Sequence, residues 1–404
     1  MARRPFLSLV TGLLTLGVLP FCGKRATTIG QESPTATGTM TIPLTYYNHY
    51  PFNHVYTANL ALGGQNLEFV VDTGSSNLLA IGDGTICPDC KNEYGYDSTY
   101  SLTSQAQKLT TKWSMNFAPI GSAQVQGYSD TVVVGGQTLP GYSFGLVTYE
   151  KGIPNIWGLA YGALANPGGN RQTPLFDALV RASGMDNVFS LRLCGAKGGS
   201  RLVLGGYDSL VPKDQRGVMW TPVKQRLWYT VGATQMTASA GSQKWTWQPT
   251  SGQQVIVDSG TNPLVLPSQS VSTLVDLLKG VASKAQITVA DDFWPNGDEP
   301  GGFTSLTPAQ IAKFPTIGLE LAGIAAAGTA DTVQLSIPPE AYFHKAKDGR
   351  YYLGIHGGAS TLVILGTVLM ENYIVLHKRG TLSATSAPEA EARLGFYPQG
   401  TCGD

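Results

Sequence analysis

The sequence contains few charged residues. Asp, Glu, Lys and Arg make up 13% of its 404 residues, about half the usual share. The 27 basic and 27 acidic residues balance, so net charge gives no reason to expect nucleic acid or an anionic membrane as a partner. The surface must be covered largely by neutral polar side chains, which stay hydrated whether or not carboxylates are protonated. This composition suits acidic surroundings.

Most motifs of hydrolases and cofactor enzymes are absent. The chain contains no HExxH, no GxSxG, no Walker loop and no GxGxxG after a strand. Its five histidines are scattered without ligand spacing, and we interpret them as loop or strand residues: His49, His54, His344, His356 and His377. The sequence therefore predicts neither a metal nor a cofactor.

Long apolar runs are also lacking, except at the N-terminus. Residues 1–25 begin with a pair of arginines, Arg3 and Arg4, and continue with an apolar stretch that Pro20 interrupts, which predicts a secretory signal peptide. An uncleaved anchor and a lipoprotein lipidated at Cys22 are the alternatives, although Pro20 and Phe21 do not suit a lipoprotein signal. No later segment is long and apolar enough to span a bilayer. We therefore expect a secreted or periplasmic protein.

Cysteine is scarce, with five in the chain. Cleavage beyond Cys22 leaves Cys87, Cys90, Cys194 and Cys402, which suggests two disulfides with three possible connectivities. The segment Cys87-Pro-Asp-Cys90 is also compatible with a redox motif or half of a zinc site. We favour a small structural loop, because no second CxxC exists and no helix-like segment follows.

The rest of the chain reads as β-structure. Residues 26–40 are polar and predict a flexible lead-in, and short alternating runs with Gly-rich breaks follow from residue 41, a pattern typical of an all-β protein. Helices are predicted only at 174–183, 269–284 and 307–314. Residues 291–302 are predicted to form a surface loop.

One pattern occurs twice. Residues 69–77 read FVVDTGSSN and residues 255–263 read VIVDSGTNP, about 190 residues apart, which is the size of a domain. Each is followed by two apolar residues and Gly, as Ile156-Trp157-Gly158 and as Ile364-Leu365-Gly366. We interpret this as two duplicated β lobes, 41–212 and 213–404, joined near residues 205–217.

The repeated motif suggests a reaction. A two-fold axis between the lobes would bring Asp72 and Asp258 together, each at the end of an apolar strand. Two carboxylates about 3 Å apart repel by roughly 5 kcal/mol at an effective dielectric constant of about 20. One proton is then shared, so the pair offers an acid and a base side by side. The charged member can deprotonate a water while the neutral member protonates the carbonyl under attack.

These residues give the sequence its resemblance to pepsin-type aspartic proteases over nearly all of residues 41–404. Within that family it is most similar to the beta-secretase (memapsin) branch, in stretches such as GLAYGALA, GGSRLVLGGYD and DDFWPNGDE. The shared-proton scheme comes with this family. The resemblance implies an all-β, bilobal fold, a cleft crossed by a β-hairpin flap, a peptide or protein substrate, binding of statine-type inhibitors and a monomeric state.

The resemblance also implies roles for individual residues. Asp72 and Asp258 match the catalytic pair, and their expected support comes from Thr73, Gly74, Ser75, Ser259, Gly260 and Thr261. The amides of Gly74 and Gly260 would face the carboxylates, and the hydroxyls of Ser75 and Thr261 would bind their outer oxygens. Cys194 would pair with Cys402 and tie the lobes, while Cys87–Cys90 would close a small loop.

The sequence departs from the family at the flap. Phe117 stands where the family usually has a tyrosine, and Leu79 replaces a tryptophan that often binds that tyrosine. One interpretation is a plain apolar exchange; the other is a looser flap with altered substrate preference or lower turnover.

Two further departures concern the ends of the protein. The sequence stops two residues after Cys402, so we expect no membrane anchor after signal cleavage. No Lys or Arg lies between Arg25 and Tyr56, so latency through a basic prosegment residue is not expected, and residues 40–47 are predicted to form the first strand.

Two hypotheses result. The first is an exported aspartic endopeptidase that works best at acidic pH. The alternative is a non-catalytic binding or inhibitor protein on the same fold, which the lost flap tyrosine favours and the two intact Asp motifs oppose.

Overall fold

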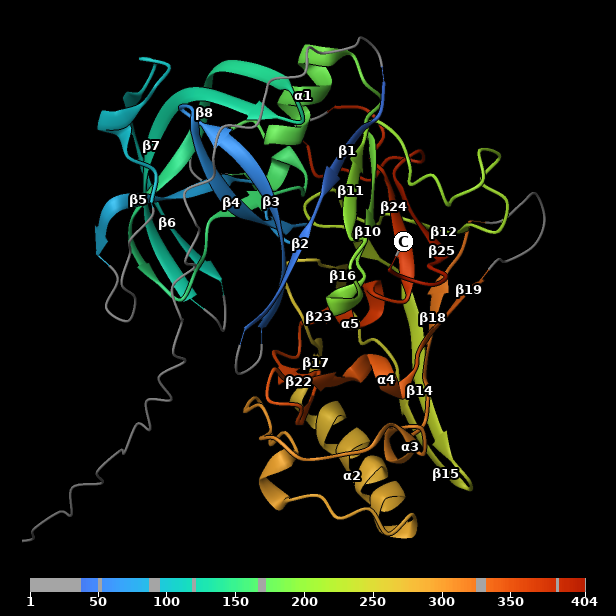
Figure 1. Cartoon of the computed structure of the whole chain (residues 1–404). Helices are drawn as coiled ribbons and strands as arrows, with labels where there is room; N and C mark the ends of the chain where they lie inside the picture. The colour runs from blue at the N-terminus through green and yellow to red at the C-terminus, as the bar shows by residue number, and fades with distance from the viewer. Residues whose placement is uncertain are drawn as a thin grey trace, which may run out of the picture.

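The computed structural model describes residues 38–49, 53–86, 95–117, 121–165, 172–324, 332–382 and 385–403. The predicted signal peptide, most of the predicted lead-in and the predicted Cys87–Cys90 bridge lie outside these residues. Figure 1 shows two bodies of β-structure, one from the first half of the chain (blue to green) and one from the second half (yellow to red). The prediction of an all-β, bilobal fold is confirmed. The lobe boundary at 212/213 stays a prediction.

The first lobe is built on one sheet of eight strands, in the order β2-β3-β4-β9-β5-β8-β7-β6. Two of its hairpins turn on glycine pairs, Gly63-Gly64 and Gly135-Gly136, which all have positive φ, as the tight turns between right-twisted strands require. The strands are β2 (Thr45–His49), β3 (Asn53–Leu62), β4 (Gln65–Asp72), β5 (Leu78–Ile86), β6 (Gln107–Phe117), β7 (Gly121–Val134), β8 (Gln137–Lys151) and β9 (Ile156–Gly158).

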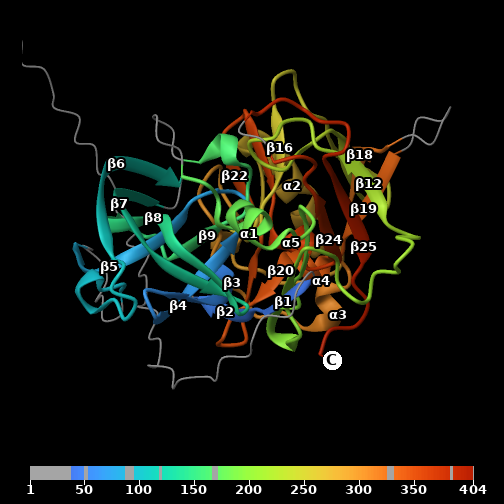
Figure 2. The ribbon, with the colours of Figure 1, turned by 90° about the horizontal axis from the view of Figure 1, so that it is seen from above.

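A second sheet contains strands from both halves of the chain. Its order is β1-β11-β10-β24-β25-β12, and Figure 2 shows it beside the first lobe. The predicted first strand, 40–47, is confirmed but divided: its first part pairs here with β11, and its second part pairs with β3. The strands are β1 (Met40–Pro43), β10 (Val188–Arg192), β11 (Arg201–Leu204), β12 (Met219–Pro222), β24 (Tyr373–Lys378) and β25 (Arg393–Pro398).

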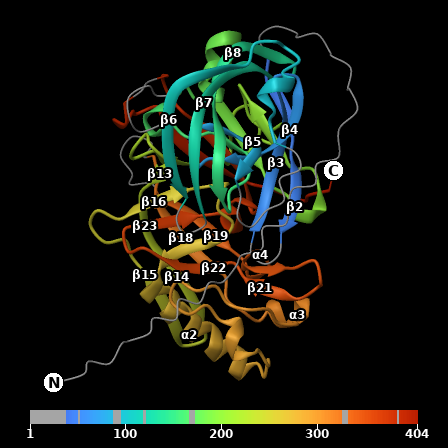
Figure 3. The ribbon, with the colours of Figure 1, turned by 90° about the vertical axis from the view of Figure 1, so that its left-hand side faces the viewer.

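The second lobe has two larger sheets and one hairpin, ordered β13-β16-β23-β17-β22, β15-β14-β18-β19 and β20-β21. Figure 3 shows these strands below β6, β7 and β8 of the first lobe. The strands are β13 (Thr230–Val231), β14 (Ala233–Ala240), β15 (Gln243–Trp247), β16 (Gln254–Val257), β17 (Leu264–Pro267), β18 (Ile317–Ala322), β19 (Thr332–Ile337), β20 (Phe343–Lys345), β21 (Tyr351–Leu353), β22 (Ile355–Gly358) and β23 (Leu362–Leu365).

The predicted duplication appears in the strand pairing. In the first lobe β4 runs parallel to β9, β9 antiparallel to β5, and β5 parallel to β8. In the second lobe β16 runs parallel to β23, β23 antiparallel to β17, and β17 parallel to β22. The strand before each Asp motif therefore pairs with the apolar-apolar-Gly segment of its own lobe, as the repeat predicts.

The predicted helices are present, and one is shorter than expected. α1 (Leu175–Ser183) and α2 (Ser268–Lys284) match their predictions, whereas α3 (Pro308–Ile311) covers only half of 307–314. Thr307 caps α3 through a capping box with Gln310. Two short helices, α4 (Pro339–Tyr342) and α5 (Thr367–Met370), were not predicted, since one turn leaves no periodic pattern.

The prediction of a surface loop at 291–302 is partly wrong. The segment begins with a single 3₁₀ turn, Asp291–Phe293. Phe293 is fully buried and Trp294 is 7% exposed. Phe293 stacks on Phe343 with the ring centroids 6.1 Å apart. Two aromatic side chains therefore anchor the segment to the second lobe.

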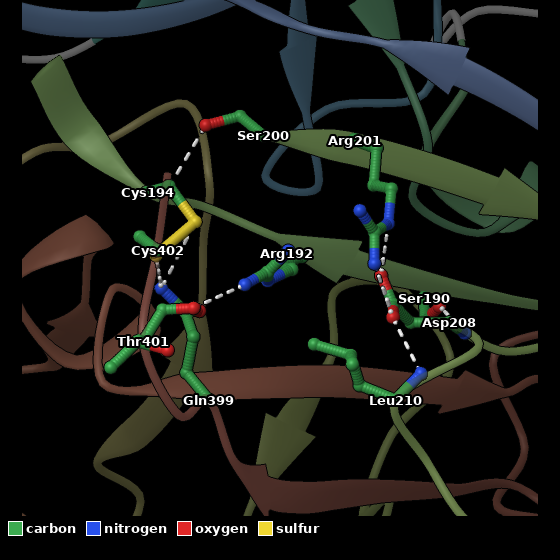
Figure 4. Close-up of polar contacts among 10 residues, drawn as sticks. All are labelled: Ser190, Arg192, Cys194, Ser200, Arg201, Asp208, Leu210, Gln399, Thr401 and Cys402. Atoms are coloured by element: carbon green, nitrogen blue, oxygen red, sulfur yellow. Dashed lines mark hydrogen bonds and ion pairs between the residues drawn. A yellow bond between two sulfur atoms is a disulfide. The ribbon is translucent and has the colours of Figure 1, made fainter. Parts of the chain in front are cut away.

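A disulfide joins Cys194, after β10, to Cys402, near the C-terminus, across 208 residues. Figure 4 shows Gln399 beside the disulfide, with its side-chain amide 3.0 Å from Cys402 Sγ. The same amide donates to the Leu193 carbonyl at 2.6 Å. Arg192 donates to the Thr401 carbonyl at 2.7 Å. The C-terminal residues are thus tied to the end of β10, in the first half of the chain.

All five histidines lie in strands, which agrees with the interpretation as loop or strand residues, but they are less scattered than the sequence suggests. His54 in β3 and His344 in β20 meet edge to face, with ring centroids 4.5 Å apart. Burial lowers the pKa of His344 well below its usual value, and it lowers the pKa of His356 to about 4 and that of His377 to about 3. Protonation of these rings in acid costs folding free energy, so stability falls as pH drops through this range.

Glu371 gives the protein's stability the opposite dependence on pH. Its carboxylate accepts a hydrogen bond from the Tyr56 hydroxyl at 2.5 Å, and burial raises its pKa to about 7. A carboxyl whose folded pKa exceeds its unfolded pKa loses stabilisation as pH rises between the two values. Glu371→Gln should therefore gain stability relative to wild type between about pH 4.5 and about pH 7.

Melting temperatures of the two proteins at about pH 4.5 and about pH 7.5 test this expectation. Glu340→Gln, on an exposed carboxyl at the start of α4, serves as the control for loss of a charge. A melting difference between Glu371→Gln and wild type that is the same at both pH values would contradict the prediction.

Candidate active site

Asp72 and Asp258 occupy equivalent places in the two lobes. Asp72 ends β4, and Asp258 follows β16 directly. The last three residues before each aspartate, 69–71 and 255–257, are apolar and buried, as expected for strands inside a sheet. Each aspartate is 6% exposed, so the fold delivers two carboxyl groups to a nearly dry place between the lobes.

The structure brings the two carboxyl groups together. A Cβ placed on Gly74 would lie 2.6 Å from the carboxyl carbon of Asp258, and one placed on Gly260 would lie 2.6 Å from that of Asp72. Real Cβ atoms do not approach other atoms so closely. Glycine is therefore required at both positions, because each motif's backbone passes directly beside the other motif's carboxyl group.

The predicted donors surround each carboxylate in the same arrangement. The Gly74 amide donates to Asp72 Oδ1 at 2.7 Å, and the Gly260 amide donates to Asp258 Oδ1 at 2.8 Å. The Ser75 hydroxyl donates to Asp72 Oδ2, and the Thr261 hydroxyl donates to Asp258 Oδ2 at 2.7 Å. Each carboxyl thus has one oxygen held by an amide and the other by a hydroxyl.

Thr73 and Ser259 connect the two motifs to each other. The Thr73 amide donates to Ser259 Oγ at 3.0 Å, and the Ser259 amide donates to Thr73 Oγ1 at 2.9 Å. Their hydroxyls then donate across the interface, Thr73 to the Val257 carbonyl at 3.1 Å and Ser259 to the Val71 carbonyl at 2.8 Å. These reciprocal bonds are buried and hold the two loops in one geometry.

The electrostatics follow from this proximity. Burial raises the pKa of Asp72 well above its usual range, and the charge of Asp258 raises it further, while the Ser75 hydroxyl and the Gly74 amide oppose the change. Proximity to a second carboxylate therefore makes Asp72 harder to ionise.

The two apolar-apolar-Gly segments, 156–158 and 364–366, lie against the residues of the Asp motifs. A Cβ on Gly158 would lie 2.6 Å from the Ser75 carbonyl oxygen, and one on Gly366 would lie 2.6 Å from the Asn262 carbonyl oxygen. The Leu159 amide donates to the Asp72 carbonyl at 2.7 Å, and the Asp258 amide donates to the Leu365 carbonyl at 3.1 Å. The second half of the repeat is therefore the support on which each aspartate rests.

The predicted flap residues lie close to one apolar cluster. Leu79 is fully buried in β5 and belongs to a cluster with Val125, Val147 and Ile156, against which Phe117 packs from the end of β6. An apolar ring at 117 therefore matches its apolar surroundings. The structure explains how Phe117 is accommodated, and its effect on turnover stays a prediction.

Two residues near the pair Asp72 and Asp258, here called the dyad, were not predicted from the sequence. Trp228 donates its indole N–H to the Gly74 carbonyl at 2.9 Å, and Tyr229 donates its hydroxyl to the Leu159 carbonyl at 2.7 Å. They lie about 150 residues after the first motif and in no repeat. No local signal marks them, because only the packing of the lobes brings them to this site.

Comparison with known proteins agrees with this geometry. The family model described as "Eukaryotic aspartyl protease" matches residues 55–388. The chain therefore belongs to the eukaryotic aspartyl protease family, and as a member it is an aspartic-type endopeptidase, a hydrolase.

Individual relatives are gastricsins. The chain is 27% identical to gastricsin of Suncus murinus over 349 residues, covering 80% of this chain and 79% of that protein. It is 26% identical to gastricsin of Homo sapiens over 363 residues, covering 84% of this chain and 82% of the relative. Pepsin-type similarity is thus confirmed, while the closer likeness to beta-secretases stays a prediction. In the described part of the chain, no helix is long and apolar enough to cross a membrane.

Proposed function

We propose that this protein is an exported endopeptidase that hydrolyses peptide bonds at acidic pH, with water activated between Asp72 and Asp258. The observation that supports this most strongly is the mutual approach of the two carboxyl groups, each at the glycine of the other motif. Export is proposed from the signal-like residues 1–25, and a monomer from the resemblance alone.

The proposed reaction uses one shared proton. The ionised carboxyl takes a proton from a water between the two groups, and the water oxygen attacks the scissile carbonyl carbon. The neutral carboxyl donates its proton to the carbonyl oxygen. The carboxyl that took the water's proton then donates it to the peptide nitrogen, while a hydroxyl of the tetrahedral intermediate returns its proton to the other carboxylate. The C–N bond breaks, two peptides leave, and the pair again holds one proton. Thr73 and Ser259 hold the two loops at the required spacing.

The pKa of Asp72 determines the expected pH dependence. With the dyad fully ionised no acid is left, and with it fully protonated no base is left, so the rate should be bell-shaped in pH. Because the pKa of Asp72 is raised, the singly protonated state extends above the usual range of a carboxyl group. We propose that apolar side chains of the substrate bind beside Phe117 and the cluster around Leu79.

Hydrolysis of a denatured protein at a series of acidic pH values, with and without a statine-type transition-state mimic, tests the proposed function. Cleavage that the mimic blocks is the expected result. A folded protein that neither cleaves nor binds the mimic would refute the proposal and favour the non-catalytic alternative.

A further inference from the structure

One short segment of the second half of the chain touches the supports of both aspartates. This segment, residues 227–231, runs from Leu227 through Trp228 and Tyr229 to Val231 and is here named the bracket. On the Asp72 side, the Leu227 carbonyl accepts from the Tyr161 amide at 3.2 Å. Trp228 Nε1 donates to the Gly74 carbonyl at 2.9 Å, and the Tyr229 hydroxyl donates to the Leu159 carbonyl at 2.7 Å.

The bracket is equally attached on the Asp258 side. Its last two residues form β13, which pairs with β16 as Thr230 opposite Ile256 and Val231 opposite Val255. The Tyr229 carbonyl accepts from the Val257 amide at 3.1 Å, and Val257 precedes Asp258. The backbone of Tyr229 therefore binds β16, the strand before Asp258. Its side chain binds Leu159, the residue that supports Asp72.

The path from Tyr229 to Asp72 is short and buried. The hydroxyl donates to the Leu159 carbonyl, and the Leu159 amide donates to the Asp72 carbonyl at 2.7 Å. Tyr229 and Leu159 are both fully buried, so water cannot replace the hydroxyl without a shift of the backbone. Arg379 reinforces the same turn from the second half, donating to the Ala160 carbonyl at 3.1 Å.

We infer that Trp228 and Tyr229 are positioning residues that set the spacing between the two aspartates. Neither is inferred to touch the reacting atoms. They act through Gly74 and Leu159 on the loop that carries Asp72, and through β16 on the strand that carries Asp258. This inference rests on the proposed function, because spacing matters only if the two carboxyl groups share a proton.

A matched pair of substitutions separates positioning from plain structural support. Tyr229→Phe removes the bond to Leu159, and Tyr342→Phe removes a bond of the same kind, from a fully buried tyrosine to the Pro315 carbonyl, also at 2.7 Å. Both variants lose one buried hydroxyl, and both should melt at a lower temperature than wild type. Only Tyr229 is connected to the dyad.

The expected results differ in kinetics. Tyr229→Phe should lower kcat roughly tenfold with KM changed less than about twofold, because a displaced catalytic group slows chemistry more than binding. Its pH–rate profile should narrow, since the separation of the dyad's two apparent pKa values falls as the carboxyl groups move apart. Tyr342→Phe should keep the wild-type kcat and profile.

Each outcome decides the inference. A wild-type kcat and pH profile in folded Tyr229→Phe, or the same changes in both variants, would overturn it. If Tyr229→Phe does not fold, Trp228→Phe decides by the same criteria, with Trp245→Phe as its control, since Trp245 Nε1 donates to the Ser270 carbonyl at 3.1 Å. Loss of the proposed function would appear differently, as wild-type protein without activity or as Asp72→Asn with full activity.

Discussion

Replacement of Asp72 by asparagine should lower kcat by a factor on the order of 10²–10⁴, the range expected when general acid–base catalysis is removed. The amide has nearly the shape of the carboxyl: its oxygen can still accept from the Gly74 amide, and its NH2 group can donate to the Ser75 hydroxyl oxygen, the two groups that bind Asp72 in the wild type. Only the shared proton is lost. Asp258→Asn should have an effect of the same order, because the two carboxyl groups act as one unit.

Hydrolysis of denatured protein across an acidic pH series measures this effect, with Asp276→Asn, on the exposed face of α2, as the control. Thermal melts show whether the variants fold. Because the pKa of Asp72 is raised in the folded protein, its ionisation costs stability as pH rises, and the asparagine variant avoids this cost. It should therefore melt no lower than wild type near neutral pH. Persistent cleavage in either dyad variant would remove that aspartate from the mechanism.

Loss of the ion pair between Asp177 and Arg379 should have the largest effect on stability. Asp177 lies on α1, and Arg379 follows β24 from the other half of the chain; their side chains are 6% and 2% exposed. Removal of one partner from a buried pair leaves an uncompensated charge and typically costs about 3–5 kcal/mol. Asp177→Asn should therefore lower the unfolding free energy by about 3–5 kcal/mol.

Arg379 also contacts the segment that supports Asp72. Its guanidinium also donates to the Ala160 carbonyl at 3.1 Å and lies 4.9 Å above the Tyr161 ring. Chemical denaturation of Asp177→Asn, with Asp348→Asn in the exposed pair with Arg350 as the control, measures the cost. Equal effects of the two substitutions on unfolding would show that burial of the pair contributes nothing.

The local features of the fold were predictable because they are encoded within short stretches. Helix α2 has seven buried apolar residues on one face, and three apolar residues directly precede each Asp motif. The loop at 291–302 shows the limit of such reasoning: its polar residues predict exposure, yet Phe293 is buried against Phe343. A partner 50 residues away decides the burial of a side chain, and the segment's own composition does not record it.

Some residues of the candidate site could be predicted from the sequence and others could not. Thr73, Ser75, Ser259 and Thr261 could be predicted to support the aspartates because each lies within three residues of one of them. Trp228, Tyr229 and Arg379 could not, since the groups that they bind beside the Asp72 motif are backbone carbonyls, which any residue presents. A carbonyl oxygen has no sequence signature, so its donor can be found only in three dimensions.

The sequence by itself determined that the chain has two related halves, that each ends an apolar strand in an Asp-hydroxyl-Gly motif, and that the fold is all-β. Only the tertiary structure decided how far apart the two carboxyl groups lie and which distant side chains hold them there. The physical reason is the distance along the chain over which each interaction acts. Strand and turn preferences act over a few residues, whereas the distance between Asp72 and Asp258, about 190 residues apart in the sequence, depends on how the two halves of the chain pack.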